Sequence, residues 1–382
     1  MKDEPSRRSF LLAGLALPAA LETSFSPLQQ KSKAAIQLKY SSLGKTGLKP
    51  TSVAFGCMIT SDPSVIEKAA DLGINYFDTA RLYQNGNNER MVGAALKSKR
   101  KSLIISTKTG ANTKEEALKH IDTSLKELGT DWVDIWHLHG KGKPEELTDE
   151  LLEAQQTAKK AGKVRFLGVS THSLPQLLPG VIQKAPHFDV VLSMYNYTMG
   201  PEMDAAFETA AKAGLGTIAM KVMAGGAGMG RPGQKPNPIA QREGAMLAAL
   251  KWVLKNPNVN IAIPSITDME QLDENMRALS EPFTDSDKQI LTARLRDIRP
   301  LYCSTCLKCR CPKGIPVADV LRYLSYSEGY GEFQLGRENF LALPAEVRNV
   351  RCKDCVSCTV RCPNGVQVAQ RLRTAQELFA GE

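Results

Sequence analysis

The sequence predicts an α/β fold in which a (β/α)8 barrel is followed by a small, mainly helical domain. Short runs rich in β-branched residues alternate with helical stretches, and eight such runs occur within about 240 residues. Strands of a parallel barrel are covered on both faces and therefore form continuous apolar runs of this kind. Eight of the nine cysteines follow residue 300, which indicates that the last part of the chain is built differently.

Eight stretches are the expected strands of this TIM barrel, and residues 113–128 and 245–255 are examples of the helical patterns between them. A hairpin over residues 40–51 is expected to plug the N-terminal end of the barrel. A doubly wound open sheet is the alternative fold, but it requires a G-x-G-x-x-G turn after its first strand, and FGCMITSDP has none. The expected strands are residues 51–57, 74–79, 103–108, 133–139, 164–170, 190–195, 216–221 and 260–265.

The first 35 residues form a separate segment. Arg7 and Arg8 directly precede Ser-Phe-Leu-Leu, and a weakly apolar stretch follows. This resembles the twin-arginine signal of proteins that are exported already folded. We therefore expect recognition by the twin-arginine export machinery and a location outside the cytoplasm, periplasmic or membrane-associated; a chance arginine pair is the alternative. Because no clean A-x-A site follows, both cleavage and an uncleaved anchor stay open.

Charge and hydropathy exclude two classes of partner. The net charge of +9 is spread along the chain, without a basic run interleaved with aromatic residues, so we expect no binding of nucleic acid. No apolar stretch reaches the eighteen or so residues of a membrane-spanning helix. Partners are therefore expected among small molecules and proteins.

Four polar residues stand at the ends of expected strands, where chemistry collects in such barrels. Asp78 closes the second strand, Tyr83 follows in its loop, Lys108 closes the third strand and His139 closes the fourth. An ammonium beside a tyrosine favours the phenolate, so we expect the pKa of Tyr83 to be lowered toward neutrality. A carboxylate would keep the lysine charged, and an imidazole would donate a hydrogen bond to a substrate carbonyl.

Four segments resemble the aldo-keto reductases, in order: YSSLGKTGLKPTSVAFGCM, FDTARLYQNGNNERMVGAAL, ISTKTG and DWVDIWHLH. The resemblance covers residues 36–295 and assigns the family's tetrad to Asp78, Tyr83, Lys108 and His139. It implies hydride transfer between a nicotinamide and a small carbonyl or alcohol substrate, with Tyr83 as the general acid. The nearby His137 faces the same way along its strand but lies one layer deeper, so it is expected in the core.

The same resemblance implies that NADP or NAD binds at the strand ends, but with an altered grip on the nicotinamide. Ser-Thr replaces Ser-Asn after the fifth strand, and Leu192 replaces a glutamine of the sixth. No arginine stands where a 2'-phosphate clamp is expected, so both cofactors stay open. Cys57 is most simply a small buried residue beside this pocket. The cofactor-binding candidates are Gly56, Cys57, Met58, Ser170, Thr171, Met220, Lys221, Ser265, Gln271, Glu274 and Asn275.

The cysteines lie in the last domain, residues 296–382. The group from Cys352 has the C-x2-C-x2-C-x3-C-P spacing of bacterial ferredoxins, which bind 4Fe-4S clusters. The group from Cys303 has only one residue before its last cysteine, yet both groups end in Cys-Pro followed by a helical pattern. Because the cysteine before proline binds the other cluster in two-cluster ferredoxins, we expect crossed ligation. The predicted sets are Cys303, Cys306, Cys309 with Cys362, and Cys352, Cys355, Cys358 with Cys311.

Zinc sites and disulfides are the alternatives for these cysteines, and one cluster in place of two also stays open. Three interpretations of the whole chain follow from the iron-sulfur prediction. The clusters exchange electrons with a redox partner protein; or they are structural parts of a carbonyl reductase; or the chain is a non-catalytic electron-transfer protein on a barrel scaffold. A complete tetrad argues against the last of these.

Overall fold

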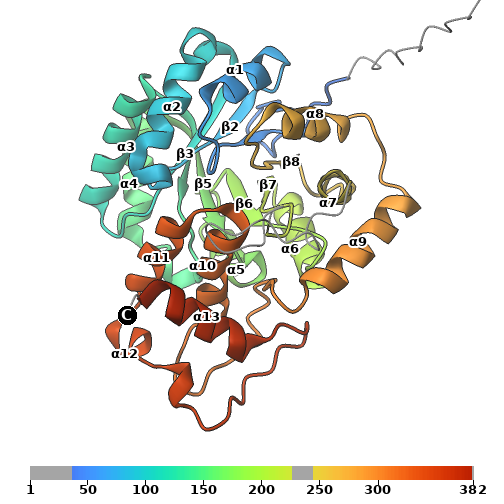
Figure 1. Cartoon of the computed structure of the whole chain (residues 1–382). Helices are drawn as coiled ribbons and strands as arrows, with labels where there is room; N and C mark the ends of the chain where they lie inside the picture. Colours follow the sequence, from blue (N-terminus) through green and yellow to red (C-terminus); the bar gives the residue numbers. More distant parts are fainter. Residues whose placement is uncertain (1–36, 226–243, 381–382) are drawn as a thin grey trace, which may run out of the picture. The chain divides into compact units, whose positions relative to one another are not determined.

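The computed structural model describes residues 37–225 and 244–380 (Figure 1). The predicted export signal, and most of the Gly- and Pro-rich loop after the seventh strand, lie outside the described residues. Contacts between residues place Ile36–Glu382 in one compact unit. All eight predicted strands are present, as β1 (Phe55–Gly56), β2 (Tyr76–Asp78), β3 (Ile104–Thr109), β4 (Val133–Leu138), β5 (Val164–Thr171), β6 (Val190–Met194), β7 (Gly216–Met220) and β8 (Ile261–Ala262).

These strands form one parallel sheet in sequence order, β1 to β8. The sheet closes on itself through parallel bridges that pair Val53 with Ala262 and Gly56 with Ser265. The backbone N–H of Gly56 donates to the carbonyl of Pro264 at 2.9 Å across this seam. The (β/α)8 barrel is therefore confirmed, and the open doubly wound sheet is excluded.

The predicted hairpin closes the N-terminal end of the barrel. Tyr40 and Thr51 form its antiparallel bridge, and Leu43 and Leu48 at its tip are buried with the side chains that fill the barrel. Gly44 lies so close to the start of β7 that a Cβ atom would be 2.3 Å from the backbone nitrogen of Gly216. With one end closed in this way, the opposite end is free for the site.

Helices on the outside of the barrel follow each strand, and α3 illustrates how they form. Thr113 caps its N-terminus by accepting from the N–H of Glu116, and Gly129 ends it with a left-handed φ of 63°. Between these caps Ile121 and Leu128 face the strands. The barrel helices are α1 (Pro63–Asp71), α2 (Asn87–Leu96), α3 (Lys114–Leu128), α4 (Asp149–Lys160), α5 (Leu174–Gln183), α6 (Pro201–Lys212), α7 (Ala245–Leu254), α8 (Met269–Arg277) and α9 (Asp285–Ile298).

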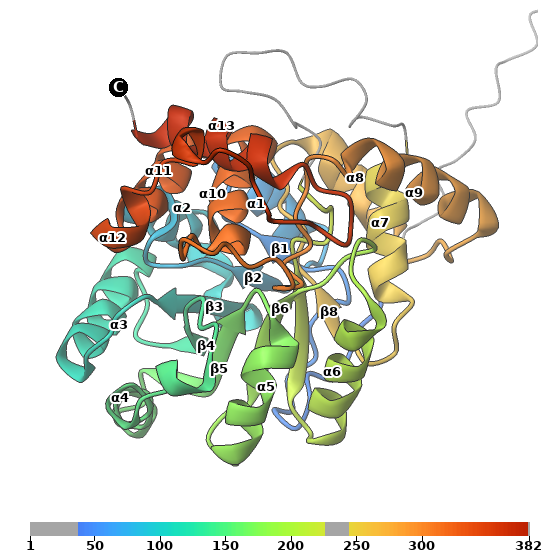
Figure 2. The same cartoon turned by 90° about the horizontal axis from the view of Figure 1, so that it is seen from below.

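Beyond α9 the described chain is helical and has its own small core (Figure 2). The Cys-Pro repeat is visible in the backbone, because Gly314 and Gly365 occupy equivalent turns with φ of 79° and 85°. A buried ion pair between Arg371 and Glu328, 2.5 Å at its shortest, joins the two helices that follow these turns. The helices are α10 (Val317–Tyr330), α11 (Phe333–Leu341), α12 (Ala345–Arg348) and α13 (Val368–Ala380).

In the described parts of the chain we find no helix that is long and apolar enough to cross a membrane.

Candidate active site

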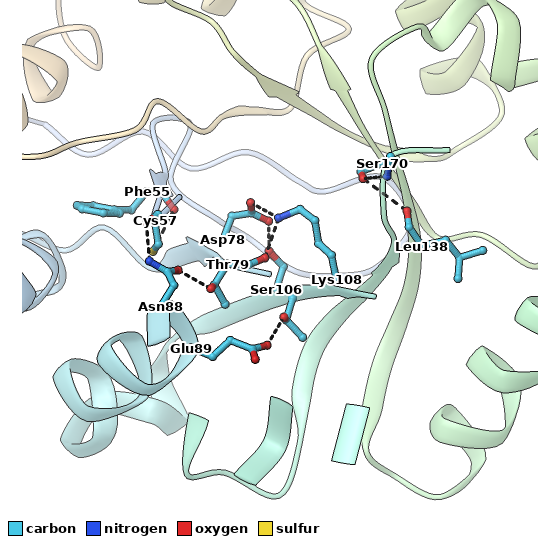
Figure 3. A network of polar contacts seen from close by, with 12 residues as sticks. Phe55, Cys57, Asp78, Thr79, Asn88, Glu89, Ser106, Lys108, Leu138 and Ser170 are labelled. Carbon is cyan, nitrogen blue, oxygen red and sulfur yellow. Dashed lines mark hydrogen bonds and ion pairs between the residues drawn. The ribbon is translucent and has the colours of Figure 1, made fainter. Parts of the chain in front are cut away.

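A buried ion pair forms the floor of the site (Figure 3). Lys108, on β3, extends its ammonium to the carboxylate of Asp78 at the end of β2, with 2.5 Å between Nζ and Oδ2. The same ammonium donates to the carbonyl of Thr79 at 2.7 Å, and the Ser106 hydroxyl donates to the other Asp78 oxygen at 2.6 Å. Each charge thus has an opposite charge and a further hydrogen bond, which lowers the cost of burying it.

Tyr83 begins a short helical turn, η1 (Tyr83–Gly86), directly after the loop that follows β2. Gln84 and Asn85 have left-handed φ values of 49° and 53°, a conformation that costs non-glycine residues energy. The Gln84 amide stabilises it by donating to the backbone carbonyls of Thr60 at 2.8 Å and Met58 at 3.3 Å. This turn holds the tyrosine ring over Lys108, whose Nζ lies 4.9 Å from the ring centroid.

The prediction that Lys108 lowers the pKa of Tyr83 is wrong. Burial raises the pKa of Tyr83 well above its usual value, and the carboxylate of Asp78 raises it further. The physical reason is that the Lys108 charge is already balanced by Asp78 at 2.5 Å, so little net positive charge reaches the phenol. Tyr83 is therefore a neutral hydroxyl near pH 7 and suits proton donation rather than proton removal.

His139 lies directly after β4, with its ring 5.9 Å from that of Tyr83 and edge-on to it. Burial and the charges of Lys108, Lys221 and Lys141 lower the pKa of His139 to about 3, so the imidazole is neutral. Its Nδ1 is buried, and no hydrogen-bond partner for it is found among the described residues. His137, by contrast, is entirely buried within the barrel, in agreement with its expected place in the core.

A cavity of about 360 Å³ opens beside Asp78 and Tyr83 at the carboxyl ends of the strands. Its wall is largely apolar, with a few polar groups, as is usual for cofactor and substrate sites. Most of the predicted cofactor residues line it, and their assignment to a nicotinamide stays a prediction. These lining residues are Gly56, Met58, Met220, Lys221, Ser265, Gln271, Glu274 and Asn275.

Three predicted cofactor residues are engaged elsewhere and do not line this cavity. Cys57 is fully buried in the barrel core. The Ser170 hydroxyl accepts from the N–H of Gly140 at 2.8 Å, and the Thr171 hydroxyl accepts from the N–H of Ser173 at 3.1 Å. Both hydroxyls thus support the loops that follow β4 and β5.

Sequence analysis missed the contribution of α10 to the site. Gly329 and Tyr330, at the end of this helix, line the cavity together with the barrel residues. Gly329 packs so closely on the loop after β7 that a Cβ atom would be 2.2 Å from the carbonyl oxygen of Gly225. One turn earlier, the hydroxyl oxygen of Tyr326 lies 3.5 Å from Nε2 of His172. The helix of the cysteine-rich domain therefore covers part of the barrel site.

The structure gathers the first predicted set of cysteines around Cys303. Burial raises the pKa of the Cys303 thiol to about 12, and nearby Cys306, Cys362 and Cys309 raise it too. Burial raises the pKa of Cys309 to about 11, and nearby Cys362, 53 residues further along the chain, raises it too. Cysteines from both Cys-Pro groups thus lie near one another here, as crossed ligation requires.

The second set gathers around Cys352. Burial raises the pKa of its thiol to about 11, with further contributions from Cys311, Cys355 and Cys358. None of the nine cysteines, all of which lie among the described residues, forms a disulfide. In residues 37–225 and 244–380 no three or more Cys, His, Asp or Glu side chains are close enough to hold a single metal ion, as zinc with its 2.3 Å bonds to sulfur requires.

The loop around Cys303 has an unusual backbone and donates hydrogen bonds to sulfur. Thr305 and Leu307 have left-handed φ values of 52° and 59°, so the chain curls between successive cysteines. The backbone N–H of Thr305 donates to the Cys303 sulfur at 3.4 Å, and the Asn364 amide donates to the Cys306 sulfur at 3.6 Å. Hydrogen bonds of this kind stabilise negative charge on sulfur.

A buried lysine–carboxylate pair beside a neutral tyrosine, at the carboxyl end of a parallel barrel, defines the chain as a barrel oxidoreductase. The comparison with known families agrees, since residues 61–295 match the model of the aldo/keto reductase family. The chain belongs to this family.

Several relatives resemble the chain over its barrel. L-galactose dehydrogenase of Arabidopsis thaliana is 28% identical over 291 residues, which cover 64% of this chain and 89% of that protein. L-glyceraldehyde 3-phosphate reductase of Escherichia coli is 26% identical and covers 66% of this chain and 91% of its own length. The uncharacterized oxidoreductase YqkF of Bacillus subtilis is 31% identical, but the match spans only 57% of that protein.

Solved structures agree with the fold. The aldo-keto reductase AKR11C1 of Bacillus halodurans superimposes with a TM-score of 0.57 at 24% identity. The match covers 67% of this chain and 96% of that structure.

Proposed function

We propose that the chain transfers hydride between a nicotinamide cofactor, NADP or NAD, and a small carbonyl or alcohol substrate. The observation that carries this proposal is that Asp78 and Tyr83 share one cavity with the residues predicted to hold the cofactor, at the end of the barrel that the hairpin leaves open. When bound, the nicotinamide supplies or accepts the hydride.

The tetrad supplies the proton and the orientation. Tyr83 donates its hydroxyl proton to the carbonyl oxygen as the alcohol forms, and its raised pKa keeps that proton in place beforehand. Lys108, held in place by Asp78, lies against the face of the Tyr83 ring, with its Nζ 4.9 Å from the ring centroid. The neutral His139 has a ring N–H with which to orient the carbonyl.

An absorbance assay tests this function directly. Oxidation of NADPH and of NADH is followed at 340 nm with a panel of aldehydes, ketones and oxo acids, using full-length protein. Carbonyl-dependent oxidation is expected with at least one cofactor. Its absence across the panel, in protein that binds neither cofactor, would favour the non-catalytic scaffold.

We also propose that the two sets of cysteines each hold a 4Fe-4S cluster. The mutual influence of four thiols in each set, drawn from both Cys-Pro repeats, supports this arrangement. The N–H donors directed at the sulfur atoms of Cys303 and Cys306 suit cysteines that bind such a cluster. Anaerobic purification followed by iron and sulfide analysis tests the proposal.

The clusters either exchange electrons with a partner protein or stabilise the domain that covers the active site. Contacts between α10 and the barrel cavity favour at least the structural role, because loss of the cluster would loosen Tyr330 and Gly329. Export through the twin-arginine pathway belongs to the same proposal, since that pathway carries proteins that already contain their cofactors.

A further inference from the structure

We infer that the substrate of this site carries a carboxylate next to its carbonyl, as in 2-oxo and 3-oxo acids or the corresponding hydroxy acids, and that Lys221 binds this carboxylate. The inference rests on the proposed function, because it names the substrate class of the same cavity. It depends on the position, surroundings and charge balance of Lys221.

Lys221 is placed at the mouth of the barrel by a strained turn. It follows β7 directly and has a left-handed φ of 53°, which is costly for a lysine. The Asn196 amide stabilises the turn by donating to the Lys221 carbonyl at 3.0 Å. The side chain lines the cavity that also contains Tyr83.

Two aromatic rings of α10 hold the Lys221 ammonium in place. Its Nζ lies 4.6 Å from the ring centroid of Tyr326 and 4.8 Å from that of Tyr330. Rings at this distance attract a cation but leave its N–H groups free to donate to an anion. The cysteine-rich domain therefore orients a lysine of the barrel toward the cavity.

Lys221 differs from the neighbouring cations because, in the described parts of the chain, no carboxylate pairs with it. Lys108 is paired with Asp78 at 2.5 Å, and Arg322 is paired with Asp319 at 2.8 Å. Burial and the charges of Arg322 and Lys108 lower the pKa of Lys221 to about 7. A bound anion would pair with the Lys221 ammonium and supply the negative charge that the described residues do not place beside it.

The Lys221 charge also acts on the catalytic centre, where it contributes to lowering the pKa of His139. Lys221 and Tyr83 line the same cavity of about 360 Å³, so a carboxylate on Lys221 would share this space with the carbonyl that Tyr83 protonates. A compact substrate whose carboxylate lies one or two bonds from its carbonyl can present both groups there, which is why we infer 2-oxo and 3-oxo acids.

Each acid and its methyl ester form a matched pair of probes, which distinguishes the effect of the carboxylate charge from that of the rest of the substrate. Phenylglyoxylate and acetoacetate are each compared with their methyl esters, both as substrates and by calorimetric titration of full-length protein loaded with the oxidised nicotinamide. The variants are Lys221→Met and Lys221→Arg. Lys255→Met is the control, because Lys255 also lies over an aromatic ring, 5.0 Å from the Phe283 centroid, but outside the cavity.

We expect the wild-type protein to prefer an acid over its ester, and Lys221→Met to lower this preference roughly 10- to 100-fold, the range of one charge-assisted hydrogen bond. Lys221→Arg should retain most of the preference, and Lys255→Met all of it.

Three outcomes would overturn the inference. The wild-type protein reduces the esters as well as the acids; or Lys221→Met leaves the ratio of acid to ester unchanged; or Lys221→Met only weakens binding of NADPH and NADH, which would assign Lys221 to the cofactor phosphates. If no probe is reduced, the panel of carbonyl compounds followed at 340 nm decides the proposed function separately, and the calorimetric difference between acid and ester still decides the role of Lys221.

Discussion

The ammonium of Lys108 lies 2.5 Å from the carboxylate of Asp78, and their side chains are only 1% and 4% exposed. Breaking such a pair from one side leaves a buried charge without a partner. We expect Lys108→Met to lower the free energy of unfolding by roughly 3 kcal/mol. Urea denaturation at pH 7 measures this loss.

Lys159→Met is the matched control for this prediction. Lys159 pairs with Asp189 at 3.1 Å, but these side chains are 37% and 26% exposed, so the loss should stay below about 1 kcal/mol. Equal losses of unfolding free energy in the two variants would mean that burial does not increase the contribution of the Lys108–Asp78 pair to stability.

The five histidines make stability depend on pH. Burial lowers the pKa of each, to about 3 for His139 and about 4 for His187. Between the usual value near 6.5 and these lowered values, the unfolded chain binds more protons than the folded chain. Stability should therefore fall as pH is lowered from 7 toward 4, by at most about 1.4 kcal/mol per histidine and pH unit.

His187→Gln tests this pH dependence at a residue outside the active site. We expect the difference in unfolding free energy between pH 7 and pH 5 to shrink by up to about 1 kcal/mol in this variant, since His187 is only half-buried. Thermal or urea unfolding at the two pH values measures it. An unchanged difference would show that His187 titrates alike in the folded and unfolded chain.

The barrel, and the location of Asp78, Tyr83, Lys108 and His139 at or after the carboxyl ends of its strands, could be predicted from sequence because each depends on local pattern. β-Branched runs determine the strands, and a polar residue at each strand end determines what faces the site. The roles of Tyr326, Tyr330 and Gly329 could not be predicted, because they depend on how α10 packs against the barrel. This helix follows the second strand by more than 100 residues in the sequence, so no local pattern reveals the contact. The pKa of Tyr83 was mispredicted because the spacing of Lys108 and Tyr83 does not reveal that Asp78 neutralises the lysine.

Iron analysis tests the crossed ligation. Anaerobically purified protein should contain about eight irons per chain, four for each cluster. Cys362→Ser should damage the cluster on Cys303, Cys306 and Cys309, and Cys311→Ser should damage the one on Cys352. Electron paramagnetic resonance of the reduced variants distinguishes the two losses.

Cys57→Ala is the control for iron content, because Cys57 is buried in the barrel core, apart from both cysteine sets. About four irons in the wild-type protein, with no effect of Cys311→Ser, would argue for a single cluster without crossing. Zinc in place of iron would remove the electron-transfer role altogether.

The proposed export through the twin-arginine pathway requires Arg7 and Arg8. Arg7→Lys with Arg8→Lys keeps the charge but removes the arginine pair, so the protein should accumulate in the cytoplasm. Cell fractionation with immunoblotting measures this retention, and Lys31→Arg with Lys33→Arg serves as a control of equal size. Export of the double lysine variant at the wild-type level would mean that the N-terminus is not a twin-arginine signal.

Replacement of Tyr83 by phenylalanine tests the central claim most directly, because it removes the proposed proton donor and little else. We expect carbonyl reduction by Tyr83→Phe to fall at least about 100-fold in kcat. Binding of the nicotinamide, measured by quenching of protein fluorescence, should stay close to the wild-type value. Turnover comparable to the wild-type protein would contradict the assignment of Tyr83 as general acid, and with it the proposed mechanism.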